Sequence, residues 1–536
     1  MALFSTQAQA EDLYSQSLLL AGARDLASAT SVDHWDLVAR QLVVLLDQFY
    51  VHLPLKRSSL GVDPVQDARL LVDEVPFMPS DVEFFRRVFN ILIRLRDRHT
   101  AIRLPSPWRD MVAYLPFAVE SYFDQAGRHL VVSKIMADTG DAEFGPGVEI
   151  THWNGTPIRR HIEALSWNTE GANPFARVAI ALRSLTARPL GYMPQPDEDW
   201  VTITYRSNKG AHRSVSVPWR IYFPETGSAA SIANVTASAN RVLFQGVDRN
   251  TLIINNTWYD LFTRATPATE RAGASDLFDD IVQAKTVATP SGEWGYLRIF
   301  SFEVPDPAGF VNRVAGLLSQ LPQNGLIVDV RANPGGSIPA GEGLMRLFTG
   351  RVVESAPVSF RNTQAVRRLG GLSPFLAWKH SLDMQYETGD VFSQGFALTP
   401  DEIGPRGVYS GRVVVIIDAL CYSTTDFFAA GMQDNGLAEI LGVDPVTGAG
   451  GANVWNHGVL GQFAAQGGGS DIQPLPSNID IDLSVRRSTR VGPSLGLPLE
   501  GLGVFADHQY QLTRRDVLEN NEDLIAFAGG ILAAGG

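Results

Sequence analysis

Residues 412–436 read RVVVIIDALCYSTTDFFAAGMQDNG, an apolar run followed by a short turn and a helix-like segment. Residues 325–336, GLIVDVRANPGG, repeat the apolar run before a glycine-rich turn. A strand is predicted over 294–302, and helices over 307–321 and 340–347. Continuous apolar strands that alternate with helices are typical of a sheet covered on both faces. These stretches predict an α/β core.

Polar and glycine residues follow both apolar runs, at the strand ends where ligands bind in open α/β sheets. Ser423 begins the predicted helix, where the Thr424 N–H and the helix dipole favour negative charge. Gly335 and Gly336 let the backbone approach a ligand, which suits an oxyanion hole. Taken alone, a serine at this place is most often a helix cap. The NPGG sequence alone is likewise more often a turn than an anion site.

The chain has 536 residues, too many for one hydrophobic core. Changes in sequence pattern divide it into a helical domain (1–108), a β-rich module (109–222), an insertion (223–290) and the α/β core (291–536). The core holds a second insertion (355–408). Residues 81–96 have apolar side chains at helical spacing. Asn154-Gly155 predicts a tight turn between two β-like runs.

The insertion at 225–275 is rich in Ala, Ser, Thr and Asn and shows weak periodicity. Two runs within it, 240–247 and 251–262, have the composition of strands. Long insertions in compact domains are often functional. One hypothesis is that this segment, or the one at 355–408, covers a site as a lid or an inhibitor.

The net charge of −13 argues against nucleic acid and anionic membranes as partners. No apolar run reaches the roughly 18 residues that span a bilayer. The first residues show no signal-peptide pattern, which leaves the cytoplasm and export after removal of a leader both open. Cys421 is the sole cysteine, so no internal disulfide is expected. Neither a metal-binding spacing nor a phosphate loop is present, and we expect no metal and no cofactor.

Several motifs stand in an order that resembles one known family. They are LIVDVRANPGG, the Ser423 stretch, the glycine-rich 448–451, GLPLEGLGVFAD from 496, Asp97-Arg98-His99-Thr100, and GVEITHWNGTPI from 147. Together they resemble the C-terminal processing (tail-specific) serine peptidases. The resemblance implies a crotonase-like catalytic core, a PDZ-like module and a helical N-terminal domain.

This family has two catalytic arrangements. The Ser–Lys dyad is excluded at its usual position, because the sequence has no lysine after Lys379. His99 and Glu500 match the other arrangement, a Ser–His–Glu triad that resembles the tricorn-type and chlamydial secreted-protease branch. A serine hydroxyl needs an adjacent base, and a carboxylate can fix the imidazole tautomer. His99 as a helix cap and Glu500 paired with an arginine remain alternatives, with His457 and His508 as reserve bases.

Three residues depart from the family pattern near the expected site: Arg98 replaces a glycine, Tyr422 a small residue and Asp426 a glutamate. We expect Tyr422, Asn333 and Arg98 to contact substrate. The PDZ-like carboxylate loop corresponds to Tyr114–Phe117, where Pro116 has no N–H to donate. Gly492–Gly496 matches a G-x-S-x-G elbow, but the following sequence breaks any helix, so a loop is predicted.

The sequence thus predicts a serine endopeptidase that acts through an acyl-enzyme on Ser423. Thr424 with Gly335 or Gly336 would supply the oxyanion hole. A peptide or protein is the expected substrate, and a homodimer stays open. The alternatives are a binding protein on the same scaffold, similar to the interphotoreceptor retinoid-binding modules, or an esterase.

Overall fold

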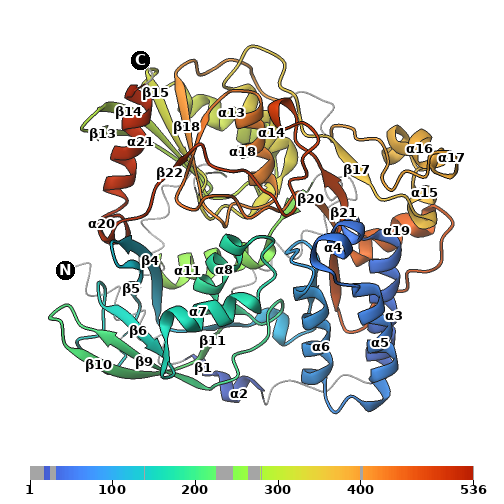
Figure 1. Ribbon diagram of the computed structural model, residues 1–536, viewed down its shortest axis with the longest axis horizontal. Coiled ribbons are helices and arrows are strands. Elements are labelled where there is room, and N and C mark those ends of the chain that lie inside the picture. Colours follow the sequence, from blue (N-terminus) through green and yellow to red (C-terminus); the bar gives the residue numbers. More distant parts are fainter. Residues whose placement is uncertain are drawn as a thin grey trace.

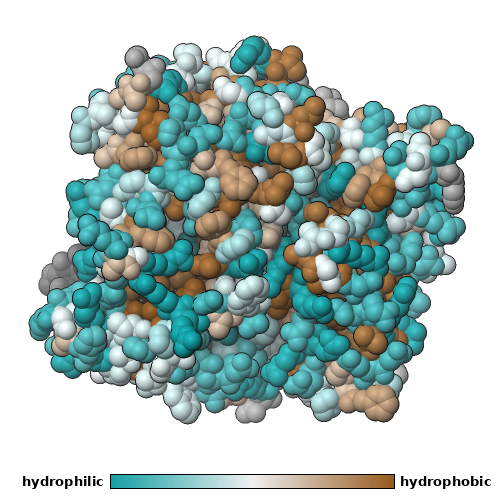
Figure 2. Space-filling model, in the orientation of Figure 1, coloured by the Kyte–Doolittle hydropathy of each residue, from teal (hydrophilic) through white to brown (hydrophobic). Residues whose placement is uncertain are grey.

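The computed structural model describes residues 17–24, 32–137, 139–224, 245–263, 278, 280–398 and 403–534. Figure 1 shows an α/β lobe, a β-rich lobe and a helical lobe that meet at the centre of the molecule, with a small helical extension beside them. The face in Figure 2 is mostly hydrophilic over the β-rich and helical lobes, with apolar residues in separate groups. Within the described residues, no helix is long and apolar enough to cross a membrane.

The α/β lobe is built on one mixed sheet. Its strands lie in the order β13 (Val282–Thr289), β14 (Gly292–Ile299), β15 (Gly325–Asp329), β18 (Arg412–Ile417), β19 (Glu439–Gly442) and β22 (His508–Gln509). Only β13 runs antiparallel to its neighbour. The central strands are continuously apolar because both of their faces are covered. Val328 and Val415 belong to the main core, whereas Ile327 and Val414 pack with residues of α21 (Glu522–Ala534).

The helices expected around this sheet form with small shifts in their ends. They are α13 (Pro307–Leu318), α14 (Ile338–Arg346) and α18 (Thr424–Asp434). They lie together in Figure 1, with α21 on the other side of the sheet. Helix α13 begins at Pro307 because Asp306 accepts a hydrogen bond from the Gly309 N–H at 3.0 Å.

The β-rich lobe contains a sheet and two helices. The sheet order is β10 (His212–Pro218), β9 (Trp200–Arg206), β6 (Glu149–Trp153), β5 (Gly127–Ile135) and β4 (Phe117–Asp124). Helices α7 (Ile158–Trp167) and α8 (Pro174–Ser184) complete it. Asn154 and Gly155 have φ angles of 47° and 75° at the predicted tight turn. A second sheet, β1 (Leu18–Leu19), β11 (Arg220–Tyr222), β3 (Val112–Tyr114) and β8 (Ala187–Pro189), lies beside it.

The helical lobe packs its apolar faces together. It contains α3 (Val32–Val44), α4 (Leu53–Leu60), α5 (Pro64–Glu74) and α6 (Asp81–Ile93). Helix α6 ends before the predicted residue 96, because Arg96 adopts a left-handed φ of 52°. The chain then forms β2 (Ala101–Arg103), which pairs with β21 (Asp480–Ser488) of the α/β lobe. This pairing places the Asp97–Thr100 motif between the two lobes.

The described part of the first insertion differs from the sequence prediction. Residues 251–262, whose composition suggested a strand, belong to helix α11 (Arg249–Thr263). The Asp248 carboxylate starts this helix by accepting bonds from the Thr251 N–H at 3.2 Å and its hydroxyl at 2.6 Å. Of the other suggested strand, 240–247, only β12 (Gln245–Val247) lies within the described residues.

The second insertion forms the extension at the right of Figure 1. It contains β17 (Val358–Phe360), α15 (Gln364–Leu369), α16 (Leu376–Asp383) and α17 (Gln385–Thr388). Strand β17 pairs with β21. Phe360, Phe375 and Trp378 pack with Trp455 and Phe463 of the α/β lobe. This insertion is therefore part of a packed core.

Candidate active site

Ser423 lies between β18 and α18 in a conformation rare for a residue with a side chain. Its φ and ψ are 63° and −120°, and its side chain is buried. Such backbone strain persists where the surrounding structure over-determines it, commonly at functional sites. Among the described residues, the Ser423 Oγ has no hydrogen-bond partner. The turn has the arrangement of a capping box, in which the Ser423 side chain faces the Asp426 N–H and the Asp426 carboxylate accepts from the Ser423 N–H. A buried hydroxyl without a hydrogen bond of its own is nevertheless unusual.

The Asp426 carboxylate holds the backbone around Ser423. It accepts bonds from the Ser423 N–H at 2.8 Å and the Gly450 N–H at 2.9 Å. The Ala449 N–H and the Thr447 hydroxyl also donate to it. Burial raises the pKa of Asp426 to about 6, against the lowering effect of these donors. Asp426 thereby ties the glycine-rich stretch to the turn that carries Ser423.

The glycine-rich stretch follows the ring of Tyr422. A Cβ atom at Gly450 would lie 2.2 Å from that ring, and one at Gly448 would lie 2.5 Å from it. Tyr422 is itself buried, and its hydroxyl accepts a bond from the Arg98 N–H at 3.2 Å. Tyr422 was expected to contact substrate. In this conformation its ring is instead buried and packs against the glycine-rich stretch.

The NPGG turn is fixed by the side chain of Asn333. Asn333 donates to the Ile299 carbonyl at 3.1 Å and accepts from the Gly335 N–H at 3.0 Å. A Cβ at Gly336 would lie 2.1 Å from the backbone of Phe302 and Glu303. The Asn333 side chain therefore shapes the turn, and the Gly335 N–H is already engaged. The Thr424 hydroxyl donates to the Gly336 carbonyl at 2.8 Å, which joins the turn to α18.

Strand β12 lies directly over Ser423. It pairs antiparallel with β16 (Gly335–Ser337), so that Gly246 faces Gly336. The Asp248 N–H donates to the Pro334 carbonyl at 2.8 Å. A Cβ at Gly246 would lie 2.3 Å from the Ser423 Oγ. The described part of the first insertion thus covers the serine.

Arg98 binds Asp248, the residue that follows β12. Its Nε lies 2.8 Å from the Asp248 Oδ2, and its Nη2 donates to the Asp248 Oδ1 at 2.8 Å. The two side chains are 3% and 2% exposed, so this ion pair is almost wholly removed from water. Glu170 lies 4.0 Å from the Arg98 Nη1. Arg98, which departs from the family pattern, anchors the covering segment.

His99 lies beside the Tyr422 ring, with ring centroids 4.7 Å apart. It is 1% exposed, and burial lowers its pKa to about 4. Neither ring nitrogen has a hydrogen-bond partner among the described residues. Together with Val247 and Asn250, His99 lines a small cavity beside the covering segment. The Asp97 carboxylate fixes its backbone by accepting from the His99 N–H at 2.9 Å.

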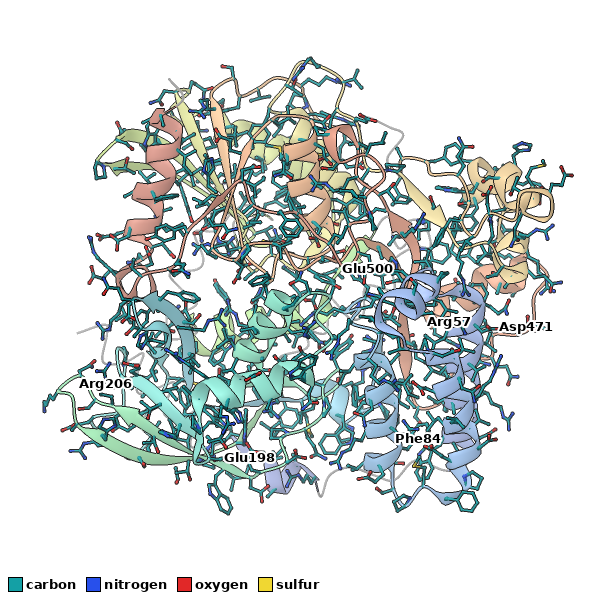
Figure 3. The ribbon with its side chains drawn as sticks, in the orientation of Figure 1. Arg57, Phe84, Glu198, Arg206, Asp471 and Glu500 are labelled. Atoms are coloured by element: carbon teal, nitrogen blue, oxygen red, sulfur yellow. The ribbon has the colours of Figure 1, made fainter. Side chains whose placement is uncertain are left out.

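Glu500 lies where the helical and α/β lobes meet (Figure 3). Its Oε1 accepts a bond from the Lys56 Nζ at 2.5 Å, and its Oε2 lies 3.8 Å from the His52 Nε2. Burial raises the pKa of Glu500 to about 8, while the Lys56 ammonium acts in the opposite direction. The alternative considered for Glu500 was an ion pair with an arginine; the partner in the structure is Lys56. The bonds recorded for the described residues do not join Ser423, His99 and Glu500 directly.

Sequence analysis missed Lys56 and His52. Both are buried, although they belong to a stretch whose other charged residue, Arg57, is exposed. The available signal was a lysine among the apolar residues at the start of α4, which could have indicated a buried cation. The other histidines considered as bases are engaged elsewhere, His457 with Gln41 and His508 with Glu439. Gly492–Ser494 forms a single 3-10 turn within a loop, as predicted.

Among the described residues, one group of side chains has the composition of a metal site. Donor atoms of His52, Asp97 and Glu500 lie within 4.8 Å of one another. The Asp97 oxygens already accept from Thr100 and Ser484, and Glu500 is paired with Lys56. The Lys56 ammonium and the Thr100 and Ser484 hydroxyls therefore already donate to the carboxylate oxygens that a metal ion would bind.

The β-rich lobe contacts the same site. Ile180 on α8 packs with Ala332, before the NPGG turn, and with Leu420, before Ser423. The Leu115 N–H, in the expected carboxylate loop, donates to the Thr186 carbonyl at 3.0 Å. The Phe123 N–H, near the end of β4, donates to Leu512 at 2.8 Å. Both N–H groups are thus engaged within the chain.

A strained, buried serine at a strand-to-helix turn, next to a glycine turn, is an arrangement typical of serine hydrolases on an α/β core. Comparison with known proteins then gives the family. Residues 293–457 match Peptidase family S41, and residues 111–232 match the PDZ domain. The chain carries a family S41 serine peptidase domain preceded by a PDZ domain, as in the tail-specific proteases. The predicted crotonase-like fold and peptidase class are confirmed.

Solved structures agree with this fold. Mature CPAF, solved with lactacystin, matches with a TM-score of 0.66 and 19% identity, over 94% of this chain and 99% of that chain. A mutant CPAF matches with a TM-score of 0.64 and 21% identity, over 94% and 97%. No curated protein sequence matches the chain.

Proposed function

We propose that the chain is an endopeptidase whose catalytic triad is Ser423, His99 and Glu500. One observation carries the proposal. The Ser423 Oγ, both ring nitrogens of His99 and the Glu500 Oε2 are all buried and have no hydrogen-bond partner among the described residues. Buried polar atoms are nearly always paired, so such a group needs an explanation. These four atoms are the ones that a triad would join.

In the proposed reaction, the Ser423 Oγ attacks the peptide carbonyl carbon while His99 takes the hydroxyl proton. The tetrahedral intermediate collapses when the C–N bond breaks and His99 gives the proton to the leaving amine. Water, deprotonated by His99, then hydrolyses the ester on Ser423. Glu500 orients the imidazole, and Lys56 favours the ionised form of Glu500 despite its burial.

The oxyanion would bind at the start of α18. The Thr424 N–H and the Gly335 or Gly336 N–H are the proposed donors, and a donor of this kind contributes about 100-fold or more to turnover. The Gly335 N–H bonds to Asn333 in the covered conformation. We infer that the turn changes when β12 leaves, which would free a glycine N–H for the substrate oxygen.

Turnover requires β12 to leave Ser423, because Gly246 occupies the space above the hydroxyl. We therefore assign residues 245–263 the role of an inhibitory segment, held by Arg98–Asp248 and by Asn255, whose side chain donates to the Ala332 carbonyl at 2.8 Å. Replacing both anchors, Asp248→Ala with Asn255→Ala, gives a variant named here the released variant. It leaves every proposed triad residue in place.

A fluorophosphonate probe tests the nucleophile, since it labels only an activated serine. We expect the released variant to be labelled at Ser423 faster than the wild-type chain, and Ser423→Ala in the same background to take no label. Circular dichroism checks that each protein is folded. A folded released variant that takes no label would overturn the catalytic proposal and favour a binding protein. Turnover of small esters without peptide cleavage would favour an esterase.

A further inference from the structure

The covering segment lies in the site as a peptide would. Gln245–Val247 adds a strand to β16, and the bond from the Asp248 N–H to Pro334 continues the pairing. Main-chain bonds of this kind bind any extended peptide, so selectivity must come from side-chain contacts. Gly246 and Asp248 are two residues apart and hence lie on the same face of the strand. One faces the Ser423 Oγ and the other faces Arg98.

The main charged partner of the Arg98 guanidinium is the Asp248 carboxylate of the covering segment. Its guanidinium is 3% exposed, and it is held by two contacts of 2.8 Å to the Asp248 carboxylate. Other polar groups facing it are Thr251, whose hydroxyl accepts at 3.1 Å, and Glu170 at 4.0 Å. Thr251 belongs to the covering segment and leaves with it. When the covering segment leaves, the guanidinium loses both Asp248 contacts and meets water. A peptide that binds in the same place buries it again, and burying a guanidinium without a well-placed acid is costly, so binding favours a peptide that supplies a carboxylate.

On the basis of the proposed function, we propose that Arg98 is a specificity-determining residue that selects peptides with an acidic side chain two residues after the one over Ser423. If the residue over Ser423 supplies the attacked carbonyl, the acid is the second residue of the released C-terminal fragment. The close approach at Gly246 adds a preference for a small residue before the cut. The chain's own sequence, Gly246-Val247-Asp248, has this pattern.

Two peptides test the inference in the released variant: LFQGVDRNTL, the sequence of residues 243–252, and its Asp→Asn counterpart. Hydrogen bonds to charged groups contribute about 1.5–3 kcal/mol, which corresponds to a preference of roughly 10- to 100-fold. We expect kcat/KM to favour the Asp peptide by this ratio, with cleavage after glycine. Mass spectrometry of the fragments identifies the bond that is cut.

Arg98 variants separate selectivity from damage to the site. Arg98→Gln should reduce the Asp-to-Asn ratio to near one, and because the ratio is taken within one variant, it does not depend on how far the substitution changes the overall rate. Arg98→Lys should give an intermediate ratio, because a lysine keeps the charge but loses the bidentate geometry. The Ser423→Ala released variant controls for contaminating proteases.

Two results would overturn the inference alone: equal hydrolysis of both peptides by the released variant, or an unchanged Asp preference in Arg98→Gln. Failure of the proposed function looks different. In that case the folded released variant would cleave neither peptide and would take no fluorophosphonate label, which removes both proposals.

Discussion

The two sides of the active site are held in different ways. On the nucleophile side, Ser423, Asp426 and the NPGG turn are joined by a continuous set of short hydrogen bonds. On the side of the proposed base, neither ring nitrogen of His99 has a hydrogen-bond partner among the described residues, and Glu500 bonds to Lys56. The serine is thus fixed in its turn by hydrogen bonds, whereas the proposed base is not yet joined to it.

The largest effect is expected at the base. His99→Ala in the released variant should lower kcat/KM for peptide cleavage by about 10⁴-fold, since general-base catalysis supplies up to this factor. The thermal midpoint should also fall, because removing a buried ring that packs on Tyr422 leaves a cavity, so rates are compared at a temperature where both proteins are folded. His457→Ala is the matched control and should retain activity. Activity that survives His99→Ala would place the base elsewhere.

The next largest effect concerns the buried ion pair. Lys56→Met should destabilise the fold by up to about 3–5 kcal/mol above pH 8, where the buried Glu500 carboxyl is ionised and would lose its cation, and by less at lower pH, where the carboxyl is protonated. Combining it with Glu500→Gln should recover most of this loss. Urea unfolding of the two single variants and the double variant measures the coupling. Additive losses would show that the pair is not linked in solution.

A smaller effect is expected on the nucleophile side. Asp426→Asn places an NH₂ group where a carboxylate oxygen now accepts bonds from the Ser423 and Gly450 N–H groups. The turn that carries Ser423 should shift, and the labelling rate of Ser423 should fall by about 100-fold. Asp426→Glu keeps the charge and should recover part of the rate. Unfolding curves give the accompanying stability change. An unchanged rate in Asp426→Asn would show that the turn holds its shape without this carboxylate.

The smallest effect is a pH dependence. Burial lowers the pKa of His52 to about 3, whereas an unfolded histidine titrates near 6.5. Between these values the unfolded chain binds the proton and the folded chain does not, so stability falls as pH decreases from about 6.5 towards 3. His52→Asn should therefore reduce proton uptake on unfolding at pH 5 by about one. Each proton corresponds to about 1.4 kcal/mol per pH unit.

Urea unfolding at several pH values between 4 and 7 measures this slope. Exposed His212 provides a control, because His212→Asn should leave the slope unchanged. A wild-type slope in His52→Asn would mean that the imidazole is already protonated in the folded protein.

Sequence patterns predicted the nucleophile side better than the base side. The apolar runs before Ser423 and the NPGG turn encode their strands locally, and both turns formed at those strand ends. The Arg98–Asp248 and Lys56–Glu500 pairs could not be predicted, because each joins segments far apart in the chain. Helix α11 was missed because its first turn depends on Asp248, whose capping role is not visible in hydrophobic periodicity. The domain boundaries, the triad and the oxyanion donors remain predictions.

The pairing of β2 with β21 has a consequence for synthesis of the protein. Ala101 pairs with Asp482, so the loop that carries His99 gains its β-sheet support only when most of the chain has left the ribosome. Strand β12 is made long before β21, Ser423 and Glu500. Because domains tend to fold from the N-terminus during translation, the blocking strand is available before the hydroxyl it covers. Strand β12 and β16, with which it pairs, are thus both made before Ser423 leaves the ribosome.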